Sequence, residues 1–240
     1  MLLRCTLTGV EPDTDLDALC ALGDAFPFTE FGVLFSFSRA GHGRYPSIRW
    51  IRTLARSIER TGDSGRWALH LCGSAVDDYL AFNPGVHQVT SAFGRVQLNL
   101  KSSIGTDKRI RAAIHASPGQ ILITQHNATN SSLAYLLCDE PTHWSLCDSS
   151  GGRGQEPLSW PAPIVSGKPF GYAGGIGPPN LERHLSTIQS VVGGLPYWVD
   201  MESKLRDADD RFDLTAAQRC LEIAASYTQM MTKARSALDG

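Results

Sequence analysis

The first candidate for chemistry in this sequence is Asp148, an acidic residue between an apolar run and a glycine-rich stretch. Trp144–Cys147 precede it and Ser149–Gly154 follow it. A carboxylate at the end of a strand, covered by such a loop, can be shielded from water, and its pKa then rises toward the range of a general acid. The structural alternative is an aspartate that starts a turn and caps the loop backbone with its side chain.

Three further side chains could exchange protons with such a carboxyl. His70 and Cys72 lie two residues apart in one apolar run, so they share a face of a β-strand. His126 follows another apolar run, between Gln125 and Asn127. Histidine titrates near neutrality, which makes both histidines candidate acid–base partners. The alternative is that these are satisfied polar side chains of the protein interior.

A metal centre needs histidines and carboxylates that converge on one point. His70, His126, Asp148 and Asp200 could converge in principle, but the sequence contains no HxH or HExxH spacing. We therefore expect neither a metal nor an organic cofactor.

Short apolar runs that favour β-strands alternate along the chain with segments of helical period. The expected strands are Leu2–Thr8, Phe31–Ser36, Trp67–Cys72, Val96–Leu100, Ile121–Thr124, Trp144–Cys147, Phe170–Ala173 and Trp198–Asp200. The expected helices are Asp13–Leu22, Ser47–Ile58, Ser74–Phe82, Asp107–His115, Asn127–Leu137, Pro179–Val192 and Leu214–Met231. Between Ser149 and Val165, glycines and prolines predict an ordered loop with at most a short helix.

Eight strands joined by helical crossovers imply parallel pairing, and they match a (β/α)8 TIM barrel of the α/β class in number and size. We expect a single domain over residues 1–240. A doubly wound open sheet is the alternative. Its usual GxGxxG after the first strand is missing at Leu7-Thr8-Gly9-Val10.

The active site of such a barrel lies at the carboxyl ends of the strands. Polar side chains gather at these ends, which is better evidence for a binding site than any one residue. We expect them to bind and convert a small-molecule substrate. In chain order they are Thr8, Arg44, His70, Cys72, Gln97, Asn99, His126, Asp148, Arg153, Gly174, Gly175, Asp200, Glu202, Ser203 and Lys204.

One part of this edge favours an anion. The glycine-rich turn Gly174–Gly177 precedes Pro178-Pro179, a pair that could begin a helix. Free backbone N–H groups at a helix start bind anions. We expect a phosphate or carboxylate between this turn and the Glu202–Arg206 loop, held by N–H groups and by Lys204 or Arg206. The alternative is a tight turn that needs the positive φ of glycine.

Composition narrows the class of protein. The net charge of −2 argues against binding of nucleic acid through bulk electrostatics. No run approaches the roughly 18 apolar residues of a membrane span, and polar residues from Thr6 onward leave no apolar signal segment. The 6 cysteines occur singly, which predicts a reduced cytoplasmic protein in which Cys5 and Cys220 are unpaired. A homodimer is compatible with the sequence.

Five segments resemble phosphoribosylanthranilate isomerase of the tryptophan pathway. They keep that family's order along nearly the whole chain and are specific for its fold. They are Gly43–Ser47, similar to the family's SPRYVS; Val96–Asn99, similar to VQLHG; Leu146–Gly154 with Trp160, similar to the strand-six LLDS-GGTG and the tryptophan after it; Ala173–Ile176 with Pro179-Asn180, similar to AGGL-x-PEN; and Val199–Ser203, similar to the strand-eight DVSSG.

The resemblance implies an Amadori rearrangement, with Asp148 as the general acid that opens a ribose ring. The family's general base is a cysteine in a strand-one KICG-T motif, and Thr8 stands in its place. A threonine hydroxyl is a poor base near neutrality, and Cys5 lies on the opposite strand face. Asn99 replaces the family's strand-four histidine, and Lys204 replaces a glycine of its phosphate loop. We expect the fold and the pocket to be kept and the original isomerase activity to be weak or absent.

Three functions follow. The first is an isomerase or lyase that acts on a small polar metabolite, phosphorylated or not, with Asp148 as general acid or base and His126, His70 or Cys72 as its partner. The second is a non-catalytic barrel that binds a ligand or a partner. The third is a metal-dependent sugar epimerase or hydrolase. An open cavity beside Asp148 would favour an enzyme, and a mouth filled by side chains would favour a binding barrel.

Overall fold

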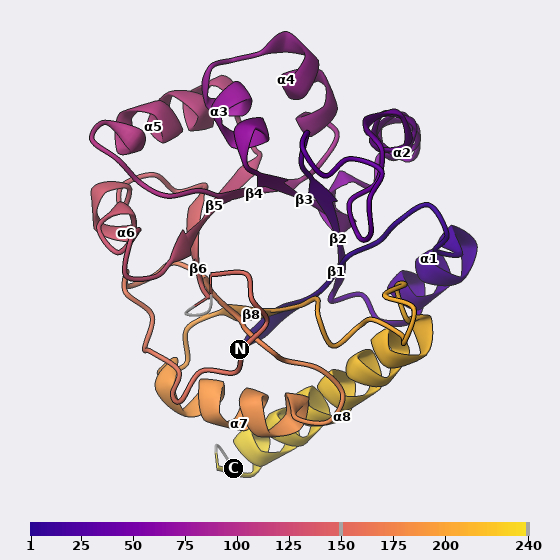
Figure 1. Cartoon of the computed structure of the whole chain (residues 1–240). Coiled ribbons are helices and arrows are strands. Elements are labelled where there is room, and N and C mark those ends of the chain that lie inside the picture. The colour runs from indigo at the N-terminus through magenta and orange to yellow at the C-terminus, as the bar shows by residue number, and fades with distance from the viewer. Residues whose placement is uncertain (149–150, 239–240) are drawn as a thin grey trace.

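The computed structural model describes residues 1–148 and 151–238, and its strands form one closed parallel barrel in sequential order, β1 to β8. Figure 1 shows the strands as a central ring with the helices outside it. The strands are β1 Leu2–Thr8, β2 Thr29–Phe35, β3 Trp67–Cys72, β4 Arg95–Asn99, β5 Ile121–His126, β6 His143–Cys147, β7 Phe170–Ala173 and β8 Tyr197–Met201. The predicted (β/α)8 barrel is confirmed, and each strand lies within two residues of its expected bounds.

The helices follow the expected order, with two exceptions. They are α1 Leu16–Ala25, α2 Ile48–Thr61, α3 Ser74–Leu80, α4 Pro84–Thr90, α5 Thr106–Ala116, α6 Leu133–Leu136, α7 Leu181–Val191 and α8 Leu214–Leu238. Residues 151–169 contain neither helix nor strand, as the glycines and prolines predicted.

The long helix expected over Asn127–Leu137 is wrong. The Asn127 side chain accepts hydrogen bonds from the N–H groups of Thr129 and Asn130, and Asn130 in turn bonds the backbone of a neighbouring loop. Asparagine side chains that bond nearby backbone groups compete with helix formation, so only the short α6 remains.

Helix α4 was not predicted from the sequence. Phe82 adopts a left-handed φ of 60°, which ends the preceding helical stretch. Asn83 then accepts from the N–H of Gly85, and Pro84 occupies the first turn. An N-cap asparagine followed by proline is a helix-start signal that could have been found.

Side chains alternate between the inside of the barrel and the helical layer. On β1, Cys5 is buried on the outer face, and Cys220 of α8 is buried nearby. Both are free thiols, as predicted. Among the residues that the structure describes, no helix is long and apolar enough to cross a membrane.

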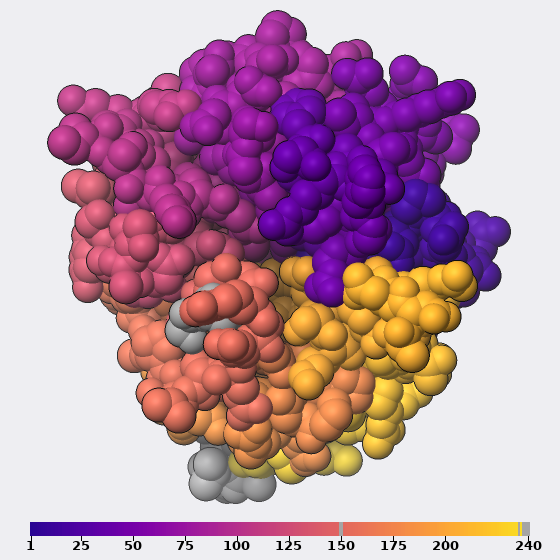
Figure 2. All heavy atoms as spheres, viewed as in Figure 1, coloured from indigo at the N-terminus to yellow at the C-terminus, as the bar shows by residue number. Residues whose placement is uncertain are grey.

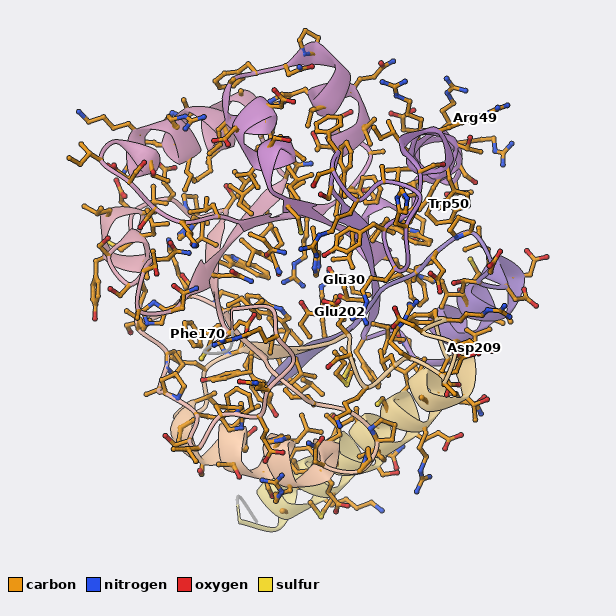
Figure 3. The ribbon with its side chains drawn as sticks, in the orientation of Figure 1. Glu30, Arg49, Trp50, Phe170, Glu202 and Asp209 are labelled. Carbon is orange, nitrogen blue, oxygen red and sulfur yellow. The ribbon has the colours of Figure 1, made fainter. Side chains whose placement is uncertain are left out.

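The interior toward the amino ends of the strands holds a buried ion pair rather than only aliphatic side chains. Arg95 donates to both carboxylate oxygens of Glu30 at 2.9 and 3.1 Å, and Thr6 donates to the same carboxylate at 2.8 Å. The guanidinium also lies 4.4 Å from the ring centroid of Trp198 and 5.3 Å from that of Trp144. Figure 3 shows Glu30 directed toward the barrel interior, while Arg49 and Asp209 lie at the periphery.

Candidate functional site

A cavity of about 300 Å³ opens at the carboxyl ends of the strands, where the fold predicts an active site. In Figure 2 loops from both halves of the chain meet over this end of the barrel. The cavity is lined by Arg44, His70, Gln97, Asn99, Gln125, Leu146, Asp148, Gly152, Arg153, Gly154, Ala173, Gly174, Gly175, Asp200, Glu202 and Ser203. Most of the predicted site residues therefore come together, although they are far apart in the sequence.

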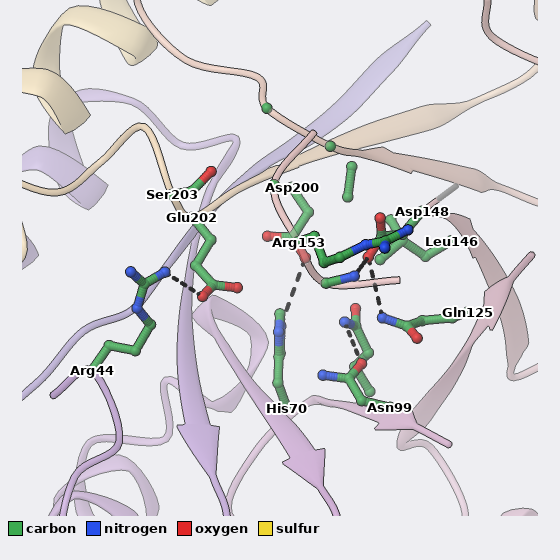
Figure 4. Close-up of a pocket in the computed structure, with 16 residues that line it drawn as sticks. Arg44, His70, Asn99, Gln125, Leu146, Asp148, Arg153, Asp200, Glu202 and Ser203 are labelled. Carbon is green, nitrogen blue, oxygen red and sulfur yellow. Dashed lines mark hydrogen bonds and ion pairs between the residues drawn. The ribbon is translucent and has the colours of Figure 1, made fainter. Parts of the chain in front are cut away.

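Asp148 is almost fully buried at the end of β6. Its carboxylate accepts a 2.6 Å hydrogen bond from the N–H of Gly152 and a 3.4 Å hydrogen bond from the amide of Gln125. Figure 4 shows the Arg153 side chain reaching across the cavity toward this carboxylate. The glycine-rich loop thus covers Asp148 as the sequence predicted, except that Ser149 and Ser150 lie outside the described residues.

Asp200, on β8, is the second buried carboxyl in the cavity. It accepts a 2.7 Å hydrogen bond from the hydroxyl of Thr8, and its other oxygen lies 4.0 Å from Nε2 of His70 (Figure 4). Burial raises the pKa of Asp200 to about 7, although the Thr8 hydrogen bond acts in the opposite direction. This carboxyl can therefore take up or release a proton near neutral pH.

His70 is buried beside Asp200, and burial lowers its pKa to about 4. The imidazole is therefore neutral near pH 7, and the contact with Asp200 is not an ion pair. His70 and Asp200 were both predicted site residues, and they meet because β3 and β8 belong to one closed barrel and direct these side chains into its interior.

Side-chain amides form the wall between the two carboxyls. Gln97 donates to the Asn99 carbonyl oxygen at 3.0 Å, and Asn99 donates to Sγ of Cys72 at 3.2 Å. Cys72 itself lines an adjoining outer hollow rather than the cavity, and burial raises the pKa of its thiol. It is therefore poorly suited to act as a thiolate near neutrality.

The structure does not bring His126 to the cavity. Strand alternation turns Gln125 inward, and His126 packs its ring 6.2 Å from that of Phe170 on the outer side. Thr8 also does not line the cavity, because it stands behind Asp200 with its hydroxyl engaged.

Ion pairs join three loops around the rim. Arg44, which follows β2, bonds Glu202 at 2.8 Å and Asp210 at 2.7 Å, both of which follow β8. Arg206 bonds Glu11 at 2.8 Å and the carbonyl oxygen of Gly9, both of which follow β1. These arginines hold the loops together, so neither guanidinium is an uncommitted ligand for a substrate anion.

Asn180 engages two polar groups of the expected anion site at Gly174–Gly177. The N–H of Gly177 donates to the side chain of Asn180 at 2.9 Å, and the amide of Asn180 donates to the Gly175 carbonyl oxygen at 2.9 Å. Helix α7 begins after Asn180 rather than at the prolines. Lys204 is exposed, and the stem of its side chain packs on Gly177.

No group of three or more histidine, cysteine or acidic side chains that could hold a metal ion occurs in residues 1–148 and 151–238. The His70, His126, Asp148 and Asp200 set does not converge because His126 faces outward.

The chain matches no protein-family model and no curated protein sequence. Solved structures do resemble it. TrpF from Jonesia denitrificans superposes with a TM-score of 0.65 at 15% identity, over 94% of this chain and 98% of that one. Phosphoribosylanthranilate isomerase from Thermotoga maritima gives 0.60 at 14% identity, over 93% and 99% of the chains. The enzyme from Thermus thermophilus gives 0.59 at 15% identity, over 93% and 98%. The predicted resemblance is thus confirmed for the fold.

Proposed function

We propose that this protein is an isomerase-type enzyme that moves a proton on a small polar metabolite bound at the carboxyl ends of the strands. The supporting observation is that two buried carboxyls, Asp148 and Asp200, line one cavity in different environments. Pairs of titratable groups held in different environments provide the acid and the base of such reactions. The fold shared with phosphoribosylanthranilate isomerases points to the same class.

The two carboxyls have distinct surroundings. Asp148 is held by a backbone N–H and an amide, which fix its position beneath the loop. Asp200 has a pKa of about 7, so it exists in both protonation states at neutral pH and suits proton abstraction or return. Together they can protonate an oxygen and remove a proton from the neighbouring carbon of one substrate.

Phosphoribosylanthranilate itself is not the substrate that we propose. The hydroxyl of Thr8 is directed to Asp200, so it acts on that carboxyl and not as the base. The base is instead Asp200, on the neighbouring strand β8. The open cavity favours an enzyme over a barrel that only binds a partner.

Proton exchange with D2O tests this function without knowledge of the product. The parent protein is incubated with a panel of aldoses, ketoses and their amino and phosphate derivatives, and NMR follows loss of the C–H signal next to the carbonyl carbon. We expect exchange with at least one compound, reduced about 10²–10⁴-fold in Asp148→Asn and in Asp200→Asn, since each removes one acid–base group.

The matched control is Asp209→Asn, which neutralises an exposed aspartate on the loop that follows β8. Its exchange rate should equal that of the parent. Binding of a panel compound with no exchange at all would instead identify a binding barrel.

A further inference from the structure

Two buried side chains of the cavity have polar atoms that no described part of the chain engages. His70 and Gln97 are 2% and 4% exposed, and both line the cavity. Within residues 1–148 and 151–238, neither ring nitrogen of His70 forms a hydrogen bond, and the side-chain oxygen of Gln97 accepts none. Since buried polar groups are normally hydrogen-bonded, these atoms point to a ligand that binds between them.

The neighbours of Gln97 determine which end of its amide meets a ligand. The Cys72 thiol donates to the His70 carbonyl oxygen at 3.8 Å, so its sulfur accepts from the Asn99 amide at 3.2 Å. The Asn99 carbonyl oxygen is then left to accept from the Gln97 amide, at 3.0 Å. This chain of hydrogen bonds leaves the Gln97 carbonyl oxygen to accept from a hydroxyl in the cavity.

The His70 ring turns Nε2 toward Asp200. Nε2 lies 4.0 Å from the Asp200 carboxylate, and Figure 4 shows the ring directed at that residue. A nearby carboxylate favours the neutral tautomer whose N–H is on its own side, so the ring presents Nε2–H. A separation of 4.0 Å is too long for a hydrogen bond between the two side chains, which leaves Nε2–H to an oxygen in the cavity.

His70 and Gln97 are adjacent, and they offer complementary groups. The register of β3 and β4 pairs these two residues directly, and both side chains point into the cavity. The N–H of His70 suits a carbonyl oxygen, whereas the oxygen of Gln97 can only accept and suits a hydroxyl. A carbonyl next to a hydroxyl-bearing carbon is the α-hydroxy carbonyl unit of aldoses and ketoses.

We propose that His70 and Gln97 bind an α-hydroxy carbonyl unit, in which His70 donates to the carbonyl oxygen and Gln97 accepts from the neighbouring hydroxyl. The catalytic part of this proposal rests on the proposed function, and the binding part rests only on the unengaged polar atoms.

The arrangement gives His70 a role in proton transfer. When Asp200 takes the proton from the carbon that bears the hydroxyl, the C–H electron pair forms a C=C bond and the carbonyl π pair moves to oxygen. Nε2–H of His70 donates to that oxygen and stabilises its negative charge. Return of a proton from Asp200 to the carbon restores the carbonyl, so exchange of the Asp200 proton with D2O labels the substrate.

Acetohydroxamate and acetamide test the binding part without a known substrate. Acetohydroxamate holds a carbonyl oxygen and a hydroxyl side by side on a planar frame, as an enediol does, and acetamide has the same carbonyl without the hydroxyl. In calorimetric titrations of the full chain, we expect acetohydroxamate to bind about tenfold more tightly, which corresponds to one hydrogen bond.

Variants assign this preference to the two residues. Gln97→Met keeps the length of the side chain without its oxygen and should bring the two affinities close together. His70→Leu should weaken both probes about tenfold, since each loses one hydrogen bond. His70→Gln should restore most of the affinity, because its amide N–H can take the place of Nε2–H. His126→Leu is the matched control and should bind as the parent does, since His126 faces outward.

NMR of the parent with nitrogen-labelled histidines needs no variant. We expect His70 to be the Nε2–H tautomer and its Nε2–H signal to shift when acetohydroxamate is added, while the His126 signals stay in place. Lack of acetohydroxamate binding, equal affinities of the parent for the two probes, an unmoved His70 signal, or His70→Gln binding no better than His70→Leu would each overturn the proposal.

Proton exchange with D2O separates this proposal from the proposed function. For a sugar that the parent exchanges, His70→Leu should be slower by about 10²–10³-fold, the usual cost of losing one donor to a negatively charged oxygen. Exchange by His70→Leu at the parent rate would refute the role of His70 and leave the proposed function standing. No exchange by the parent, with the binding results as expected, would refute only the proposed function.

Discussion

At the scale of single residues, the pair formed by Thr8 and Asp200 differs most from the site that the resemblance implies. Thr8 stands where the resemblance places a cysteine base, yet its hydroxyl donates at 2.7 Å to a buried carboxyl. Gly32 makes room for this side chain, because a Cβ at Gly32 would overlap Thr8 Oγ1. The threonine thus positions Asp200, the residue on the neighbouring strand β8 that we propose as the base.

The raised pKa of Asp200 predicts a specific dependence of stability on pH. Ionisable groups around this carboxyl are Glu30 and Asp148, which raise its pKa, Arg95, which lowers it, and neutral His70. Between about pH 4 and pH 7 the unfolded chain has released the Asp200 proton while the folded chain retains it. Stability contributed by this group therefore falls as pH rises through that window and is constant above it.

Asp200→Asn removes this dependence. Because the pKa moves from 3.8 to about 7, and each pKa unit corresponds to about 1.4 kcal/mol, the variant should gain up to about 3 kcal/mol relative to the parent between about pH 5 and pH 8. Urea unfolding at the two pH values measures the gain, and Asp209→Asn serves as the control. If the parent and Asp200→Asn differed by the same free energy of unfolding at both pH values, Asp200 would titrate as an ordinary carboxyl.

At the scale of elements, the strands were predictable because apolar runs and turn residues are local signals. Two errors in the helices have local causes too, since the side chains of Asn127 and Asn130 compete with a helix and Asn83-Pro84 starts one. Because the site of such a barrel lies at the carboxyl ends of the strands, the predicted strand ends identified most of the residues that line the cavity. The outward turn of His126 depends on the bounds of β5, which extends two residues further than expected.

The Glu30–Arg95 pair was not predicted. Glu30 directly precedes the apolar run that predicted β2, and its partner is 65 residues away, so only the register of β2, β3 and β4 brings them together. Both side chains are at most 2% exposed. Charges buried to this degree must be compensated, so removal of either partner alone should be strongly destabilising.

Arg95→Met should destabilise the protein by about 3–5 kcal/mol, because it leaves the Glu30 carboxylate buried without its counter-ion. The double variant Glu30→Gln with Arg95→Met should be more stable than Arg95→Met alone, since the introduced glutamine side chain carries no charge and can still accept from Thr6. Urea unfolding provides the comparison. Arg66→Met, which removes an exposed pair with Asp24, is the control and should cost at most about 1 kcal/mol. If the double variant lost as much free energy of unfolding as Glu30→Gln and Arg95→Met lose together, the counter-ion argument would be refuted.

At the scale of the whole molecule, the two ends of the chain depend on each other. Strand β1 pairs with β8 to close the barrel, and α8 covers the outer face of β1. At the rim, Arg44 and Arg206 join the loops after β1, β2 and β8. The closed barrel could be predicted from the alternation of strands and helices, but these ion pairs could not, because each depends on how loops distant in the sequence meet.

The last prediction follows from this closure. Cys5 on β1, Cys147 on β6 and Cys220 on α8 are all buried, and burial raises the pKa of Cys5 above its usual range and that of Cys220 to about 12. Since the thiolate is the reactive form, these thiols should react with an alkylating reagent only after the barrel opens. If the barrel is a single cooperative unit, opening that exposes any one of them requires global unfolding.

We therefore expect Cys5, Cys147 and Cys220 to be labelled with the same free energy of opening, equal to that from urea unfolding. Mass spectrometry of the labelled peptides as a function of urea measures this free energy at each site. Exposed Cys20 and Cys138 are internal controls, which should be labelled in native conditions at rates that denaturant hardly changes. Labelling of Cys147 at a markedly lower free energy than Cys5 and Cys220 would mean that the strands around β6 open while the pairing of β1 with β8 persists, and the chain would then consist of two folding units rather than one.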